Sequence, residues 1–155
     1  MTTHTNPKQS EAPIANTAGV LLIWPFVFDL ADASIRPAAI AQNDLIQIGE
    51  IPAGHTLVPV LSRFAIPQID SNVSPTGDYS IGTAASAAAL KGSAASETAA
   101  ALFGEDILIP ATAIGSPTDP TPIYIKAINA SATVPSTGKI VAELVYRAWD
   151  SALDA

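Results

Sequence analysis

Few side chains in this sequence could do chemistry, and they lie far apart. The chain has two histidines, His4 and His55, and neither stands at metal-ligand spacing from the other or from a carboxylate. A metal site needs several such groups that converge on one point. We therefore expect both histidines to lie on the surface without a ligand. The chain has no cysteine, which excludes disulfides, thiolate metal sites and cysteine nucleophiles.

The carboxylates are equally dispersed, and no spacing marks a catalytic pair. A glycosidase needs two carboxyl groups that face each other, and a calcium loop needs acidic ligands at alternating positions. Residues 77–82 carry two glycines at the spacing of a phosphate-binding loop, but Thr83 stands where that loop requires lysine. No Gly-x-Ser-x-Gly elbow is present. We expect a protein that is not an enzyme and that uses no metal or cofactor.

Small uncharged residues must cover much of the surface. Of the 155 residues, 48% are hydrophobic and 14% are charged, whereas about 25% are charged in an average globular protein. Such a surface suits close packing against another protein. The net charge is −7 and the basic residues are scattered, so we expect no direct contact with nucleic acid and none with an anionic membrane.

The chain divides into two regions of different composition. Residues 1–18 are polar with almost nothing to bury, and they predict a flexible N-terminal arm that is either disordered or ordered only by a partner. This region has no apolar stretch behind a basic start, so we expect no export signal. Residues 19–155 predict a single domain.

Alternating side chains predict the strands that build this domain. The clearest alternation runs through residues 139–149, and weaker copies of it occupy residues 45–51 and 123–128. One face of the 139–149 strand would carry Ile140, Ala142, Leu144 and Tyr146. The apolar run at residues 20–28 predicts a buried strand, with Pro25 at an edge or bulge.

Turn signals and shorter patterns complete the prediction. The Pro-Ala-Gly turn at residues 52–54 predicts a β-hairpin between residues 45–51 and a strand at residues 56–66 that is kinked at Pro59. Short strands are expected around Ile35, at residues 77–82 and at residues 106–109. Residues 83–103 are rich in alanine and predict either short helices or a compact loop. Together, these strands and turns predict a mainly β, antiparallel sandwich or jelly roll with an Ala-rich insertion.

Three segments together resemble a family of tailed-phage virion proteins. Residues 43–57, NDLIQIGEIPAGHTL, are similar to the family's pattern of alternating apolar residues, a glycine and a Pro-Ala-Gly turn. Residues 77–82, GDYSIG, resemble a short strand that follows a long loop. Residues 138–146, GKIVAELVY, are similar to the family's last strand. The resemblance spans roughly residues 19–149 in order and spacing.

The resemblance implies a structural role. Members of the family are commonly capsid decoration (cement) proteins or other small head-associated proteins with a β-sandwich or jelly-roll fold, and they bring no catalytic residues. The implied protein is made in the host cytoplasm and assembles as a homotrimer. It would bind the major capsid protein on the outside of the virion and stabilise the shell.

The same sequence features are compatible with two other roles. One is a receptor-binding or glycan-binding β-sandwich module of a phage fibre, although its loops would usually carry aromatic residues and carboxylates. The other is a structural subunit of the tail or the head–tail connection. For any of these roles, the candidate contact residues are Trp24, Arg147 and Trp149, because large aromatic and arginine side chains commonly anchor interfaces.

Overall fold

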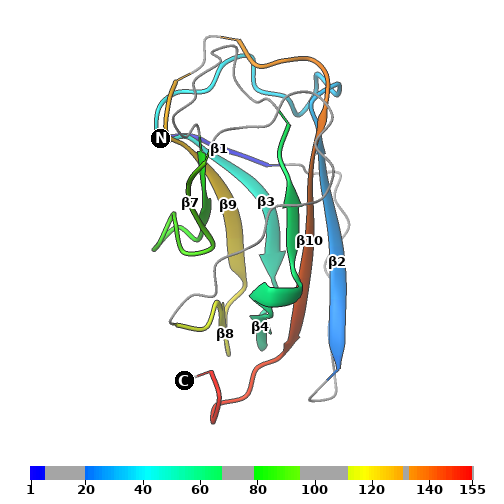
Figure 1. Cartoon of the computed structure of the whole chain (residues 1–155), viewed down its shortest axis with the longest axis vertical. Helices are drawn as coiled ribbons and strands as arrows, with labels where there is room; N and C mark the ends of the chain where they lie inside the picture. The colour runs from blue at the N-terminus through cyan, green and yellow to red at the C-terminus, as the bar shows by residue number, and fades with distance from the viewer. Residues whose placement is uncertain (6–19, 68–78, 95–111, 131–132, 155) are drawn as a thin grey trace.

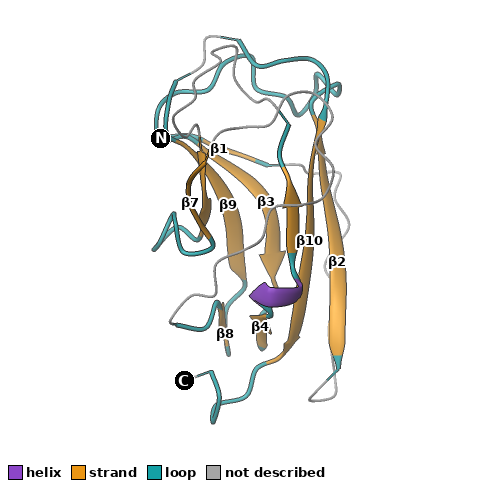
Figure 2. Ribbon diagram, in the orientation of Figure 1, coloured by secondary structure: helices purple, strands orange, loops and turns teal. Residues whose placement is uncertain are grey.

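The chain folds into a β-sandwich, which confirms the predicted fold class. The computed structural model describes residues 1–5, 20–67, 79–94, 112–130 and 133–154. In that part of the chain, Figure 1 and Figure 2 show two layers of strands and a single turn of 3-10 helix.

The first sheet has the strand order β1-β3-β9-β6-β7. Its strands are β1 (Thr3–His4), β3 (Leu45–Ile51), β9 (Thr121–Ala127), β6 (Tyr79–Gly82) and β7 (Lys91–Ala94). All neighbours in this sheet are antiparallel except β1 and β3, which run parallel. Its outward positions are polar on the central strands, as Gln47 and Lys126 illustrate.

The second sheet is built around β10, the longest strand. Its strands are β2 (Leu21–Asp29), β10 (Lys139–Ala148), β4 (His55–Leu57), β8 (Gly115–Ser116) and β5 (Arg63–Ala65). The path β2-β10-β4-β8 is completed by β5, which also pairs with β10. Between β4 and β5 the chain makes the 3-10 turn η1 (Pro59–Leu61). The predicted kink at Pro59 is therefore a full break between two short strands.

The predicted alternation in β10 is confirmed. Its inward side chains are fully buried and include Ile140, Ala142, Leu144 and Tyr146. They meet isoleucines of the opposite sheet, among them Ile48 and Ile125, in one hydrophobic core. This burial of apolar side chains from both layers is the main term that stabilises the sandwich.

The predicted hairpin at residues 45–66 is wrong. β3 pairs with β9 in the first sheet, whereas β4 pairs with β10 in the second, so the turn at residues 52–54 carries the chain across the sandwich. Gly54 has a φ of 75°, which glycine adopts without strain, and its N–H donates to the carbonyl of Ser116 at 2.8 Å. Both ends of the turn are buried at Ile51 and His55, because each faces the core between the sheets.

The strand predicted around Ile35 is wrong, and the described part of the Ala-rich region does not form the helices that were one of its two predicted alternatives. No strand forms at Ile35, because Asp32 organises a turn in which its carboxylate accepts the N–H of Ser34 at 2.9 Å. The described part of the Ala-rich region, residues 83–94, forms a turn and strand β7 without a helix. The rest of that region and the strand predicted at residues 106–109 lie outside the described residues.

The first residues of the predicted arm have a place in the fold. Thr3 and His4 pair with Leu45 and Ile46 at the edge of the first sheet. The N–H of Leu45 donates to the carbonyl of Thr2 at 2.8 Å. Sequence patterns miss this strand because two residues are too few to show alternation. Residues 6–18 of the predicted arm lie outside the described residues.

Candidate functional site

Exposed apolar side chains gather at one end of the sandwich. Seven large hydrophobic side chains are exposed in the described part of the chain, and all but Met1 lie around the last residues of β10. The six are Val20, Leu21, Ile23, Val60, Leu61 and Leu153, and we call this surface the apolar end. Figure 1 shows that β2 begins, β10 ends and the C-terminus lies at this end of the molecule.

Strand β2 supplies the first part of the apolar end. It is an edge strand whose side chains alternate between the core and the outside. Leu21 and Ile23 point outward beside Arg147 and Val145 of β10, and Ile23 is 60% exposed. The sequence predicted a buried strand here, but no described element covers its outer face. Pro25 occupies the edge position that was predicted, where the missing N–H breaks no ladder bond with β10.

The 3-10 turn supplies the second part. Val58 still bonds to β10, since its N–H donates to the carbonyl of Val145 at 2.7 Å. Pro59 has no N–H and ends the pairing. The turn then projects Val60, which is 69% exposed, and Leu61 before the chain returns at Ser62.

The C-terminal turn supplies the third part. Arg147 donates two hydrogen bonds to the carboxylate of Asp154, at 2.7 and 3.0 Å. The carboxylate also accepts the N–H of Asp150 at 2.8 Å. This pairing folds residues 150–154 back toward β10 and leaves Leu153 outside. The charge of Arg147 is therefore neutralised within the chain.

The three candidate contact residues lie in different environments. Trp24 faces the core, where its ring meets Phe26 edge to face with centroids 6.1 Å apart, so its outward neighbours Leu21 and Ile23 form the surface instead. Arg147 is half-buried in its ion pair with Asp154. Trp149 is half-buried just after the end of β10, and its backbone N–H donates to the carbonyl of Gly54 at 2.7 Å.

Sequence patterns missed most of the apolar end. Two signals were available: Pro25 marks β2 as an edge strand, and Pro59 marks the break that projects Val60 and Leu61. Neither signal says which face of a strand a second layer covers. That is decided by how the two sheets stack.

A polar cluster at the opposite end fixes the N-terminal strand. The carboxylate of Asp44 accepts the N–H of Thr2 at 2.6 Å and that of Ala41 at 3.0 Å. His4 Nε2 lies 3.7 Å from the same carboxylate. The hydrogen bonds from Ala41 and Thr2 hold the pKa of Asp44 below its ordinary value, and His4 contributes to the same shift. Asn43, with a φ of 70°, turns the chain into β3 at this point.

This cluster brings one histidine and one carboxylate together. Within the described ranges, no group of three or more histidines, cysteines and carboxylates is placed to hold a metal ion. Within the same ranges, no helix is long and apolar enough to cross a bilayer.

His55 is not the surface residue that the sequence predicted. It is buried on β4, where its ring packs edge to face on Tyr146 with centroids 5.5 Å apart. Its Nδ1 lies 3.0 Å from the carbonyl oxygen of Ala53. The reason is that β4 lies between β10 and β8, so its inward side chains enter the core. Burial also raises the pKa of Tyr146 to about 12.

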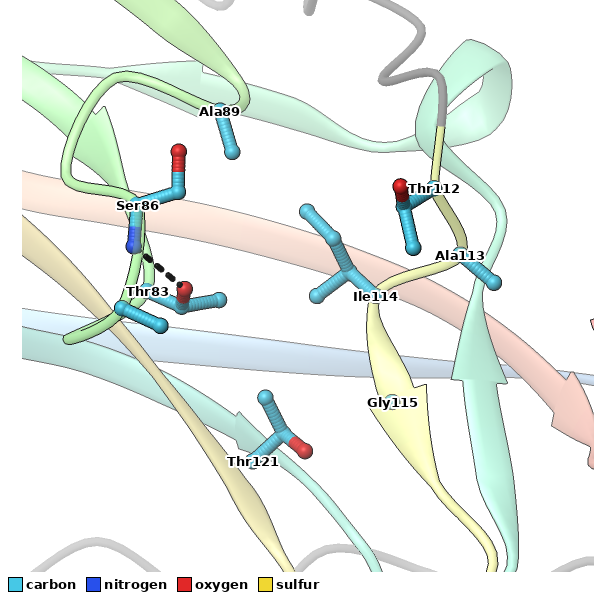
Figure 3. A pocket seen from close by; sticks show the side chains of 9 residues that line it. Thr83, Ser86, Ala89, Thr112, Ala113, Ile114, Gly115 and Thr121 are labelled. Carbon is cyan, nitrogen blue, oxygen red and sulfur yellow. Dashed lines mark hydrogen bonds between the residues drawn. The ribbon is translucent and has the colours of Figure 1, made fainter. Parts of the chain in front are cut away.

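A pocket of about 540 Å³ opens beside β6 and β8. The described residues that line it are Thr83, Ala85, Ser86, Ala89, Thr112, Ala113, Ile114, Gly115 and Thr121. Figure 3 shows the side chains of Thr83, Ile114 and Thr121 directed toward this space, with the backbone N–H of Ser86 bonded to Thr83 Oγ1 at 3.1 Å. The described part of this lining carries hydroxyl and methyl groups and contains no carboxylate, imidazole or amine.

Comparisons with known proteins agree with the architecture. No family model matches the sequence, and no significant match is found among curated proteins. Among solved structures, the fold is similar to that of a chain in the cyanophage Pam1 capsid asymmetric unit, with a TM-score of 0.53 and 14% identity over 92% of this chain and 95% of that one.

A second solved structure is similar to the same degree. A chain in the capsid of Ralstonia phage GP4 has a TM-score of 0.55 and 20% identity, over 92% of this chain and 93% of that one. At such identities the two matches show a shared fold.

Proposed function

We propose that this chain is a structural protein of a tailed-phage virion that binds the outside of the capsid as a decoration protein and stabilises it. The observation that carries the proposal is the fold match over nearly the full length of chains in two phage capsids. The resemblance of residues 43–57, 77–82 and 138–146 to virion proteins supports the same role.

The physical character of the molecule suits such a role. A decoration protein must hold a rigid shape on a shell that carries many equivalent sites, and the tightly packed two-sheet core supplies that rigidity. Modest affinity at each site is amplified when several linked copies bind together. The proposed role is non-catalytic and needs no cofactor, nucleic acid or membrane. Its partners would be the major capsid protein and further copies of this chain.

The test is cosedimentation of purified protein with capsids assembled from the major capsid protein of the same phage. We expect saturable binding at a fixed ratio to the shell subunit, and capsids that withstand higher temperatures when decorated. An unrelated β-sandwich protein of similar size and charge is the control. Absence of binding to expanded capsids would refute the capsid-surface role, and an electron-microscopy map of the virion would then place the chain at the neck or tail or exclude it.

A further inference from the structure

The pocket beside β6 and β8 is lined by residues from both layers of the sandwich. Its described lining comes from the turn that follows β6, from the residues that lead into β8 and from Thr121, the first residue of β9. β6 and β9 belong to the first sheet, whereas β8 belongs to the second. The volume of about 540 Å³ lies within the range of about 300–1,000 Å³ that is usual for small-molecule sites.

Hydrogen bonds fix the wall of the pocket beside β6. The N–H of Thr83 donates to the carbonyl of Ser86 at 2.9 Å, and the N–H of Ser86 donates to Thr83 Oγ1 at 3.1 Å. The same carbonyl accepts the N–H of Ala89 at 3.2 Å. The turn lies directly against β6, because a Cβ on Gly82 would overlap the carbonyl of Ser86. This wall is therefore held by its own backbone and by its contact with β6.

The opposite wall is tied to the second sheet. The carbonyl of Ile114 accepts the N–H of Leu57 at 2.7 Å and the hydroxyl of Thr56 at 3.3 Å. Gly115 then pairs with Thr56, and a Cβ on this glycine would overlap the backbone of His55, so β8 approaches β4 closely. A site whose walls are ordered before binding loses less conformational entropy when a ligand enters.

The side chains of the lining select the chemistry of a ligand. Among the described lining residues there is no charged group and no aromatic ring. An ion would therefore enter without a partner for its charge, which is costly, and a planar ring would find no aromatic surface on which to stack. The methyl groups of alanine, threonine and isoleucine offer contacts to an aliphatic chain. The serine and threonine hydroxyls can each donate to or accept from a polar group of the ligand.

We propose that this pocket binds a small neutral aliphatic molecule that carries a hydroxyl or amide group. Its chain would lie against Ile114 and Ala89, and its polar group would bond to the hydroxyls that Thr83 and Thr121 direct into the space (Figure 3). Thr83 Oγ1 accepts the N–H of Ser86, which leaves its own proton for an oxygen of the ligand. The site does not depend on capsid attachment, so either proposal can fail without the other.

An NMR titration of the full chain with hexanol tests the proposal, with hexanoate and hexylamine as charged ligands of the same chain length. We expect hexanol to shift the amide resonances of Ser86, Gly115 and Thr121 in a saturable way. The two ions should bind about tenfold more weakly or less, because their charge finds no partner in the pocket.

Variants that fill the pocket provide the second part of the test. Ala89→Phe should weaken hexanol binding by about tenfold or more, because the ring occupies the space of the ligand. Ala88→Phe is the matched control, since Ala88 is exposed and is not among the described lining residues, and it should bind hexanol as the wild-type chain does. Thr121→Phe fills the same space from β9, so the test stands if thermal melts show that Ala89→Phe does not fold.

Four outcomes would overturn the proposal. Hexanol could cause no saturable shift at the amides of the pocket, or it could shift only those of the apolar end. All three ligands could bind the pocket with equal affinity, which would show that its neutral lining does not select the ligand. Lastly, hexanol could bind the folded Ala89→Phe and Thr121→Phe variants as tightly as it binds the wild-type chain.

Discussion

The hydroxyl of Ser62 accepts the N–H of Val145 at 2.9 Å, although these residues are 83 positions apart. The same hydroxyl donates to the carbonyl of Val58 at 3.0 Å. β10 pairs with β4 before η1 and with β5 after it, so the 3-10 turn interrupts its ladder of backbone bonds. One buried side chain therefore satisfies the backbone that this interruption would leave unpaired.

Replacing Ser62 with alanine should lower the free energy of unfolding by about 1–3 kcal/mol, because the buried N–H of Val145 loses its acceptor. Urea denaturation measures the change. Ser136→Ala is the control, since Ser136 is exposed, and it should change stability by less than about 0.5 kcal/mol. Equal stability of the two variants would contradict the role assigned to the hydroxyl.

Gly49→Ala should destabilise the sandwich by about 1–3 kcal/mol, because a side chain must be forced into a filled core. Gly49 lies at the irregularity in the pairing of β3 with β9, with a φ of 156°, and a Cβ there would overlap the Leu144 side chain from the other sheet. Gly92→Ala is matched to it, because a Cβ on Gly92 meets no atom within 4 Å. Thermal melts of both variants compare them, and a neutral Gly49→Ala would show that the sheets are not in close contact here.

The N-terminal strand should be released by acid. Hydrogen bonds from Ala41 and Thr2 keep the pKa of Asp44 below its ordinary value of 3.8 in the folded chain. A carboxyl group with a lowered pKa stabilises the fold above its unfolded pKa, and this contribution is lost as the pH falls through the folded value. Amide exchange at Leu45, whose N–H is bonded to Thr2, should therefore accelerate below about pH 4.

The variant Asp44→Asn separates this effect from general acid unfolding. It lacks the titrating group, so its exchange rate at Leu45 should show no step in that acid range. An identical acid step in the wild-type chain and in the variant would exclude Asp44 as the cause.

Tyr146 should resist ionisation in the folded state. Burial raises the pKa of its phenol to about 12, whereas an unfolded tyrosine titrates near pH 10. A raised pKa means that the contribution to stability is complete below pH 10 and is lost as the pH rises through about 12. Above pH 10, the free energy of unfolding should thus fall less steeply with pH in Tyr146→Phe than in the wild-type chain. Tyr124→Phe should behave as the wild type. Equal steepness in all three proteins would refute the assignment.

The sequence by itself determined the fold class and the strands with long, regular patterns. In β10, alternation alone identified the inward face, because a strand with one face in the core must repeat its apolar residues every second position. β9 and β3 were predicted for the same reason. Pro25 correctly marked an edge strand, whereas Pro59 was predicted only to kink a strand that it in fact ends, since a residue without an N–H cannot continue a ladder.

Only the tertiary structure decided which strands are neighbours and which faces are covered. The turn at residues 52–54 has the same local chemistry whether it closes a hairpin or crosses between sheets, so the partners of β3 and β4 depend on distant strands. The burial of His55 and Trp24 and the exposure of Ile23 follow from the stacking of the layers. Local patterns specify the period of each strand, whereas pairing and burial depend on residues far away in the chain, such as Ser62 and Val145.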